Sequence, residues 1–186
     1  MRIWKILEPV LFVVGCFCSF TLTVYFWKAT QGRYIRINEP KRCASDWVIN
    51  AIEAPHYDLL MYSSMEGINA VTPLTMRNWF ARLLPCVNHA RVRNNTVNGQ
   101  GSRATGWVLP NYRKNMMWVN GEFWDRLDIE DQASLIIHEC THLTLGTLDY
   151  AYYWGKKYSS LRGQNATRNA DTITKIIMNI NYYTCY

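Results

Sequence analysis

The stretch SLIIHECTHLTLGTLDYAYYWG, residues 134–155, holds two histidines four positions apart, with a glutamate directly after the first. On a helix, positions i and i+4 lie one turn apart on the same face, so His138 and His142 can bind one metal ion. Glu139 borders that face, and in zinc hydrolases a carboxylate at this position acts as the general base. We therefore predict a catalytic zinc site, the alternative being a chance match on a buried amphipathic helix.

A catalytic zinc ion usually takes three protein ligands and leaves one position for water, so a third ligand must be found. No histidine follows His142 and no glutamate follows Glu139, which leaves Asp149 and Asp171 as the acidic residues downstream. Asp149 lies seven residues after His142, behind a glycine-threonine pair that can turn the chain back toward the metal. The spacing favours Asp149 as the third ligand, and a helix N-cap is its alternative role.

The composition, 49% hydrophobic with 8 Trp and 12 Tyr, excludes a disordered chain. The pattern predicts an α+β fold that is mostly helical, with helical spacing over residues 44–94 and an exposed Asn- and Gly-rich loop over 94–106. The runs TGWVLP (105–110) and NMMWVNG (115–121) predict a small sheet or hairpin. The histidine pair falls on a helix that Asp128 can cap, and further helices are expected near 150–161 and 168–182.

The histidine motif and the run GTLDYAY (146–152) together resemble the aspzincins, the deuterolysin and peptidyl-lysine metalloendopeptidase family, whose pattern is HExxH followed by GTxDxxYG. The resemblance covers residues 105–180 best. It implies a zincin-like fold, a Zn²⁺ cofactor, peptide or protein substrates, and zinc ligation by His138, His142 and Asp149. It also implies that Glu139 activates the attacking water and that the Tyr152 hydroxyl donates to the oxyanion. The alternative role of Tyr152 is aromatic packing.

One departure from the family bears on specificity. In lysine-specific members an acidic pocket combines the aspartate of an Asn-Ala-Asp segment with a glutamate three residues later. Here Asp171 is present, and we predict it as a substrate-binding residue, but Thr174 stands in place of the glutamate. The alternative role of Asp171 is in the first turn of a helix, where negative charge interacts favourably with the dipole. A lysine-related preference is therefore left open.

A run of nineteen uncharged residues, PVLFVVGCFCSFTLTVYFW (9–27), is long enough to span a bilayer. No clear cleavage site follows it, so we expect residues 1–27 to be a transmembrane anchor or an uncleaved signal. Much of the formal charge of +6 lies directly after this run, which favours a juxtamembrane linker over residues 28–43 and argues against a nucleic-acid partner. The basic residues are Lys28, Arg33, Arg36, Lys41 and Arg42. A zincin-like domain is then expected over residues 44–186.

Two features disagree on the side of the membrane at which this domain lies. The excess of lysine and arginine after the hydrophobic run favours the cytoplasm. An even number of cysteines follows the run, Cys43, Cys86, Cys140 and Cys185, compatible with two disulfides in an oxidising compartment. We expect a single-pass membrane protein with its domain outside the cytoplasm, the alternative being secretion after signal cleavage. Cys140, inside the histidine motif, is expected to be a packed thiol.

The sequence thus predicts a membrane-anchored zinc metalloendopeptidase, used either in housekeeping or as a toxin or effector. The rival prediction is a catalytically inactive, membrane-anchored envelope protein that keeps the fold and binds a partner. The sequence holds no signal for the oligomeric state.

Overall fold

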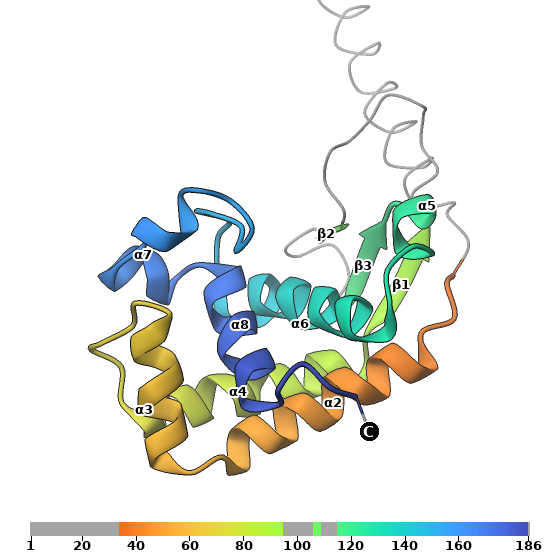
Figure 1. Cartoon of the computed structure of the whole chain (residues 1–186). Coiled ribbons are helices and arrows are strands. Elements are labelled where there is room, and N and C mark those ends of the chain that lie inside the picture. Colours follow the sequence, from red (N-terminus) through yellow and green to blue (C-terminus); the bar gives the residue numbers. More distant parts are fainter. Residues whose placement is uncertain (1–33, 95–105, 109–114, 186) are drawn as a thin grey trace, which may run out of the picture.

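The computed structural model of the chain describes residues 34–94, 106–108 and 115–185. Within these ranges the protein is mostly helical, with one three-stranded sheet at one end of the helices (Figure 1). The described residues include no helix that is both long and apolar enough to cross a bilayer. The hydrophobic run 9–27, expected to be an anchor, lies outside the described residues.

Three helices fill the region in which helical spacing was predicted: α2 (Asn38–Glu53), α3 (His56–Met65) and α4 (Pro73–Asn88). Helix α4 begins where the Thr72 hydroxyl accepts a 3.2 Å hydrogen bond from the Thr75 amide, with Pro73 as the first helical residue. The side chains of Trp47 in α2 and Phe80 in α4 are fully buried. Helices α2 and α4 pack against each other, and both pack against the helix that carries the histidine motif.

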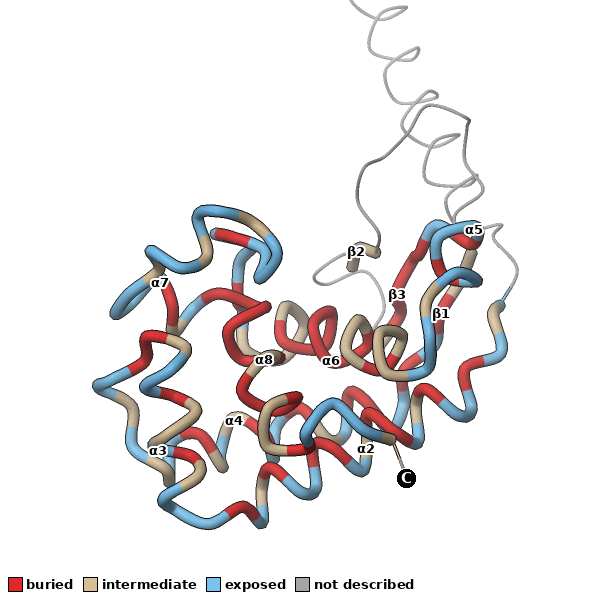
Figure 2. Tube along the Cα trace, viewed as in Figure 1, coloured by how far each residue is buried: buried red, intermediate tan, exposed pale blue. Residues whose placement is uncertain are grey.

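The sheet consists of β1 (Arg91–Asn94), β2 (Gly106–Val108) and β3 (Met116–Val119), in the order β1-β3-β2. Strands β2 and β3 pair antiparallel, as the predicted hairpin requires. All four residues of β3 are buried, which agrees with its continuous apolar run (Figure 2). Strand β1 pairs parallel with β3 and was not predicted, because its four residues fall in the region 44–94 that was expected to be helical.

The histidine motif lies on α6 (Ile129–Leu145), which follows the short helix α5 (Gly121–Trp124). Asp128 caps α6 as predicted, accepting a 2.8 Å hydrogen bond from the Asp131 amide. Gly146 ends α6 in the left-handed region, with φ of 67°, a conformation that favours glycine. The chain then runs through the 3₁₀ turn η1 (Tyr158–Ser160) and α7 (Gly163–Thr167) into α8 (Ala170–Ile180).

The prediction of a helix near 150–161 is wrong, because only the short turn η1 forms there. The first part of this segment is held in irregular conformation by side chains from the start of α8. The Asn169 amide group hydrogen-bonds both the amide and the carbonyl of Ala151, and the Asp171 carboxylate accepts from the Tyr153 amide. These contacts replace the backbone hydrogen bonds that a helix would supply. The helix expected near 168–182 is confirmed as α8.

Two disulfides cross-link the helices, and one of them corrects the expectation for Cys140. Cys140 faces α4 from α6 and forms a disulfide with Cys86, their Cα atoms lying 5.8 Å apart. Cys140 is therefore not a free thiol. The sequence spacing did not reveal this pair because it depends on how α4 packs against α6. The other disulfide joins Cys43 in α2 to Cys185 near the C-terminus.

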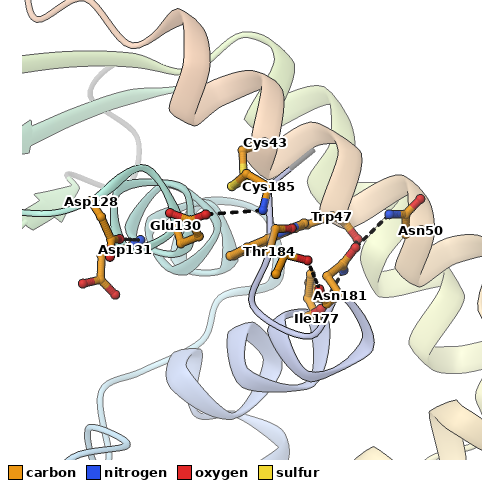
Figure 3. The surroundings of a disulfide bond; sticks show 10 residues. All are labelled: Cys43, Trp47, Asn50, Asp128, Glu130, Asp131, Ile177, Asn181, Thr184 and Cys185. Carbon is orange, nitrogen blue, oxygen red and sulfur yellow. Dashed lines mark hydrogen bonds between the residues drawn. A yellow bond between two sulfur atoms is a disulfide. The ribbon is translucent and has the colours of Figure 1, made fainter.

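Hydrogen bonds around the Cys43–Cys185 disulfide fasten the C-terminal residues to α2 and α6 (Figure 3). The Trp47 indole donates a 2.6 Å hydrogen bond to the Thr184 carbonyl, and the Asn181 side chain donates to the Trp47 carbonyl. The Cys185 amide donates to a Glu130 carboxylate oxygen at the start of α6. The end of the chain thus holds α2, α6 and α8 together.

The folded part extends further toward the N-terminus than the expected domain start at residue 44. Tyr34 forms an isolated antiparallel bridge with Arg93, Ile37 is buried, and α2 begins at Asn38. Residues 34–43 therefore belong to the folded unit and not to a linker. Their basic side chains, Arg36, Lys41 and Arg42, hid this in the sequence, although Pro40 and Cys43 between and beside them are buried.

Candidate metal centre

The face of α6 opposite its contact with α4 presents the histidine motif. His138 and Glu139 are buried and His142 is partly buried. The imidazole rings of His138 and His142, one helical turn apart, meet edge to face with centroids 4.9 Å apart. The structure thus brings together the pair that the four-residue spacing predicted.

Asp149 completes a compact set of three ligand atoms with the two histidines. Its Oδ1 atom lies 3.2 Å from His138 Nε2 and 3.2 Å from His142 Nε2, and the two nitrogens are 3.2 Å apart. In a tetrahedral zinc site with bonds of about 2.0–2.1 Å, neighbouring ligand atoms are separated by about 3.3–3.4 Å. The side chains therefore fit a zinc ion in both chemical type and spacing.

The hydrogen bond made by Nδ1 of each imidazole leaves Nε2 facing the metal position. His138 Nδ1 lies 2.6 Å from Asp171 Oδ1, and His142 Nδ1 lies 2.9 Å from the Thr147 carbonyl oxygen. A carboxylate and a carbonyl can only accept, so each Nδ1 carries a proton. The Nε2 lone pairs are then free to bind a cation, as in metal sites whose histidines are held by a second partner.

Hydrogen bonds within this centre shift the pKa values of its members. Burial disfavours the charged form of His138, but hydrogen bonds to Asp149 and Asp171 outweigh it and raise its pKa to about 10. Burial would raise the pKa of Asp149, whereas its hydrogen bonds with His138 and His142 hold it well below the ordinary range. The centre therefore favours positive charge, which a divalent cation supplies while displacing the protons.

The turn that returns Asp149 to the histidines is built from buried polar contacts. Gly146 ends the helix, and the Thr147 hydroxyl lies 2.7 Å from the Thr141 hydroxyl inside the protein. Leu148 then forms a parallel bridge with Asn169, whose side chain clamps Ala151. Asp149 does not cap a helix, because the next helical turn, η1, begins only at Tyr158.

Glu139 is a buried carboxylate whose environment disfavours its charge. Its Oε2 atom is buried without a hydrogen-bond partner. Desolvation raises its pKa, and the charges of His138 and His142 oppose this shift only in part. A Cβ atom at Gly106 in β2 would lie 3.1 Å from Glu139 Oε1, so a glycine there leaves room for the carboxylate. An unpaired buried oxygen of raised pKa suits a proton acceptor that awaits a water molecule.

Tyr152 lies at the open side of the centre. Its hydroxyl donates a 3.2 Å hydrogen bond to Asp149 Oδ2, and its ring stacks on Trp154 with centroids 4.9 Å apart. Partial burial and the charge of Asp149 raise the pKa of Tyr152 to about 12. The phenol therefore keeps its proton at neutral pH and can donate where negative charge develops.

Asp171, predicted to bind substrate, is buried and uses both carboxylate oxygens inside the protein. Oδ1 accepts from His138 Nδ1 and Oδ2 accepts a 2.7 Å hydrogen bond from the Tyr153 amide. The carboxylate thus orients one histidine and the aromatic loop at once. Its position in the first turn of α8, the alternative considered above, also holds.

A pocket of about 410 Å³ runs from His138 between α6 and α8, and we call it the α6–α8 pocket. Each helix contributes residues at positions i, i+3, i+4 and i+7, which is one helical face. Those residues are Asp131, Ser134, Leu135 and His138 from α6, and Asp171, Thr174, Lys175 and Met178 from α8. Phe123, Leu127, Tyr152, Tyr153 and Trp154 close its sides. The pocket therefore begins at the metal centre.

Sequence reasoning missed the polar residues that support the centre. Asn169 and Thr147 are buried and make the contacts that place Asp149 and His142. The available signal was the Asn-Ala-Asp segment and the Gly-Thr pair themselves, since polar residues beside an apolar helix need internal partners. His56 and His89 are exposed and lie outside the three-residue metal group.

The geometry agrees with comparisons to known proteins. Residues 85–175 match the aspzincin family, described as lysine-specific metallo-endopeptidase. No curated protein sequence matches the chain. Among solved structures the chain is similar to the zinc peptidase from Grifola frondosa, with a TM-score of 0.60 and 20% identity, covering 77% of this chain and 92% of that chain. That likeness concerns the fold, which is mostly helical with a small sheet in agreement with the prediction.

Proposed function

Residues 85–175 belong to the aspzincin family of metallopeptidases, with Zn²⁺ as cofactor, and from this premise we propose that the chain is a zinc metalloendopeptidase. The observation that supports it most is the triangle of Nε2, Nε2 and Oδ1 atoms with 3.2 Å sides, beside a buried glutamate with an unpaired oxygen. Its substrates are peptides or proteins. His138, His142 and Asp149 would hold the zinc ion.

The residues around the metal position divide the work of hydrolysis. When bound, zinc lowers the pKa of a water molecule and polarises the carbonyl of the peptide bond. Glu139 accepts the proton of the attacking water and later delivers it to the leaving amine. Tyr152 donates its hydroxyl proton as a hydrogen bond to the oxygen on which negative charge develops. Asp171 and the Thr147 carbonyl keep the imidazoles in the required tautomer.

Replacing Glu139 by glutamine tests this proposal directly. Glutamine has nearly the same size but cannot accept the proton, so Glu139→Gln should lower kcat by about 10²–10⁴-fold while retaining about one zinc per chain. Zinc content by atomic absorption and cleavage of a mixed peptide library are the measurements. Glu53→Gln, at an exposed position at the end of α2, is the control and should keep full activity. A wild-type chain that holds zinc and cleaves no peptide would contradict the proposal.

The rival, an inactive binding protein that keeps the fold, does not account for a buried carboxylate with an unpaired oxygen. Burying such a group destabilises a protein, and a chain without catalytic use for it gains nothing from keeping it. The same metal and peptide measurements separate the two functions. The proposed chemistry is compatible with a role as a toxin or effector as well as with housekeeping. Identifying the protein that is cleaved would distinguish the two roles.

We also propose that residues 1–27 anchor the chain and that the domain lies outside the cytoplasm or is secreted. The two disulfides support this compartment, since such bonds persist in oxidising surroundings. Protease added to intact cells should then degrade the domain, and detergent should be needed to release it if the anchor is retained. Protection of the domain in intact cells would contradict this localisation.

A lysine-related preference is suggested by the description of the family that the chain matches. It is not part of the proposal, because Thr174 stands where the lysine-specific members have a glutamate, and Lys175 also lines the pocket. The side chain that the pocket takes is considered next.

A further inference from the structure

The length of the α6–α8 pocket determines which of its residues a substrate side chain can contact. Seven residues separate Asp131 from His138 on α6, and seven separate Asp171 from Met178 on α8. At 1.5 Å per residue each wall is about 10 Å long. His138 and Asp171 are hydrogen-bonded to each other, so both walls begin at the metal centre. A substrate side chain that enters beside the centre therefore passes along the middle of the pocket before reaching the far end.

The carboxylate nearest the metal centre is not available to a substrate cation. Both oxygens of Asp171 are engaged, by His138 Nδ1 at 2.6 Å and by the Tyr153 amide at 2.7 Å, and the residue is buried. Three residues further along α8 stands Thr174, whose hydroxyl donates to the Ala170 carbonyl within its own helix. The entrance half of the pocket thus offers no free negative charge from α8.

A lysine occupies the middle of the same wall. Lys175 lies four residues after Asp171, about 6 Å along the helix. Its ammonium group donates to the Tyr183 hydroxyl and lies over two aromatic rings, 5.2 Å from the centroid of Tyr153 and 4.8 Å from that of Tyr183. Tyr153 itself lines the pocket, so this positive charge stands at the pocket wall.

The ammonium group of a substrate lysine in this pocket would lie beside that of Lys175. Its side chain reaches about 6 Å from the Cα atom, at carbon–carbon bonds of about 1.5 Å. That length ends beside Lys175 and stops short of Asp131, the carboxylate at the far end. Burial and the neighbouring charges of Asp128 and Glu130 also raise the pKa of Asp131. Like charges placed together in a partly buried site repel strongly.

Apart from Ser134, the remaining walls are apolar. Leu135 and Met178 come from the two helices, and Phe123, Leu127 and Trp154 close the sides. A pocket of about 410 Å³ has room for an aromatic side chain, which would displace water from it on binding. Apolar surface that leaves water here contributes about 25 cal/mol per Å². A substrate carboxylate would lose its hydration against these side chains, and to pair with Lys175 it would have to displace the Tyr183 hydroxyl and the two aromatic rings from the ammonium group.

We propose that the α6–α8 pocket takes a large apolar side chain of the substrate, aromatic or long aliphatic, and that Lys175 excludes lysine and arginine. This inference rests on the proposed peptidase function, and it names the substrate class for that site.

Cleavage of a peptide library by the zinc-loaded full chain, with products sequenced by mass spectrometry, tests the preference. At one position beside the cleaved bond, phenylalanine, tyrosine, leucine and methionine should exceed lysine by at least about tenfold. A preference for lysine or arginine there would overturn the proposal, and so would a preference for aspartate or glutamate. No preference at any position would also overturn it.

Reversing the charge of Lys175 tests the excluding residue. In Lys175→Glu the ratio of kcat/KM for a lysine peptide to that for its phenylalanine counterpart should rise at least about tenfold. Lys175→Met, which keeps the apolar length of the side chain but removes its charge, should raise this ratio less than Lys175→Glu does. Lys157→Glu makes the same net charge change at an exposed residue that does not line the pocket, and its ratio should stay at the wild-type value. An unchanged ratio in Lys175→Glu would contradict the role of Lys175.

Binding to the Glu139→Gln variant separates the two proposals. The zinc-loaded variant should bind the phenylalanine peptide at least about tenfold more tightly than the lysine peptide, as measured by isothermal titration calorimetry. If the wild type cleaves nothing but this difference is found, the peptidase function fails and the pocket inference stands. If the wild type cleaves peptides and the lysine peptide binds better, the pocket inference fails and the peptidase function stands.

Discussion

The two ends of the α6–α8 pocket are built in different ways. At the metal end, each imidazole Nδ1 has a fixed acceptor, Asp171 of α8 for His138 and the Thr147 carbonyl for His142, and the Tyr152 hydroxyl donates to Asp149. At the far end, Asp131 and Met178 face each other across apolar side chains, and no ion pair of the described residues includes Asp131. The metal end is fixed by directional hydrogen bonds, whereas the far end is shaped by packing.

The difference separates two properties of an enzyme. Directional contacts hold ligand atoms at the short distances that metal binding requires, and small displacements there weaken it. Packing contacts define the size and polarity of a pocket. A substitution there is tolerated but changes which substrate side chain the pocket prefers. Substitutions at the metal end should therefore remove activity, whereas substitutions at the far end should redirect it.

The largest effect is expected for Asp149→Ala, compared with Asp131→Ala at the far end. Loss of the third ligand should lower the zinc content from about one per chain to near zero and reduce peptide cleavage to background. Asp131→Ala should keep the zinc and the cleavage of apolar substrates. Zinc content after dialysis and kcat/KM are the measurements. Equal zinc content in the two variants would remove Asp149 from the ligand set.

A smaller effect is expected for Tyr152→Phe. Because the pKa of Tyr152 is raised to about 12, its hydroxyl stays protonated and available as a donor. Its loss should lower kcat by about 10²–10³-fold with little change in KM or zinc content. Tyr153→Phe removes a hydroxyl from the adjacent residue and should leave kcat near the wild-type value. A similar loss of kcat in both variants would assign Tyr152 to loop packing.

The smallest effect of the three is expected for Asp171→Asn. Asparagine can still accept from His138, but its amide group meets the Tyr153 amide, so the imidazole is held less firmly. Zinc affinity should fall by about 10–100-fold, and activity should recover partly at high zinc concentration. Asp46→Asn, at an exposed position on α2, is the control and should keep wild-type affinity. Wild-type zinc affinity in Asp171→Asn would show that this carboxylate does not support the metal centre.

The metal end could be predicted from the sequence because its chemistry is local. His138 and His142 are one turn apart on a single helix, and Asp149 follows after one glycine-terminated turn. Their relation depends on helix geometry and on a short connection, both of which have clear sequence patterns. The hairpin of β2 and β3 was predictable for the same reason, since consecutive strands with a short connection usually pair.

The pocket and the cross-links could not be predicted because they depend on contacts between distant segments. Lys175 reads as an exposed residue in the sequence, and only the packing of α8 on α6 places it in a pocket wall. Cys140 pairs with Cys86 because α4 passes beside α6. The segment 150–161 was expected to be helical. Its irregular conformation depends on hydrogen bonds from Asn169 to Ala151, which the residues of the segment itself do not reveal.

The clamp formed by Asn169 also determines where this protein can change its length. Residues 148 and 151 are tied to residues 168–170 by the bridge and the amide hydrogen bonds, so the intervening chain leaves and returns at nearly the same place. The free energy of closing such a loop grows only slowly with its length. Insertions between the clamp ends can therefore accumulate without moving Asp149. This segment is therefore where the chain can be lengthened with the least effect on the metal centre.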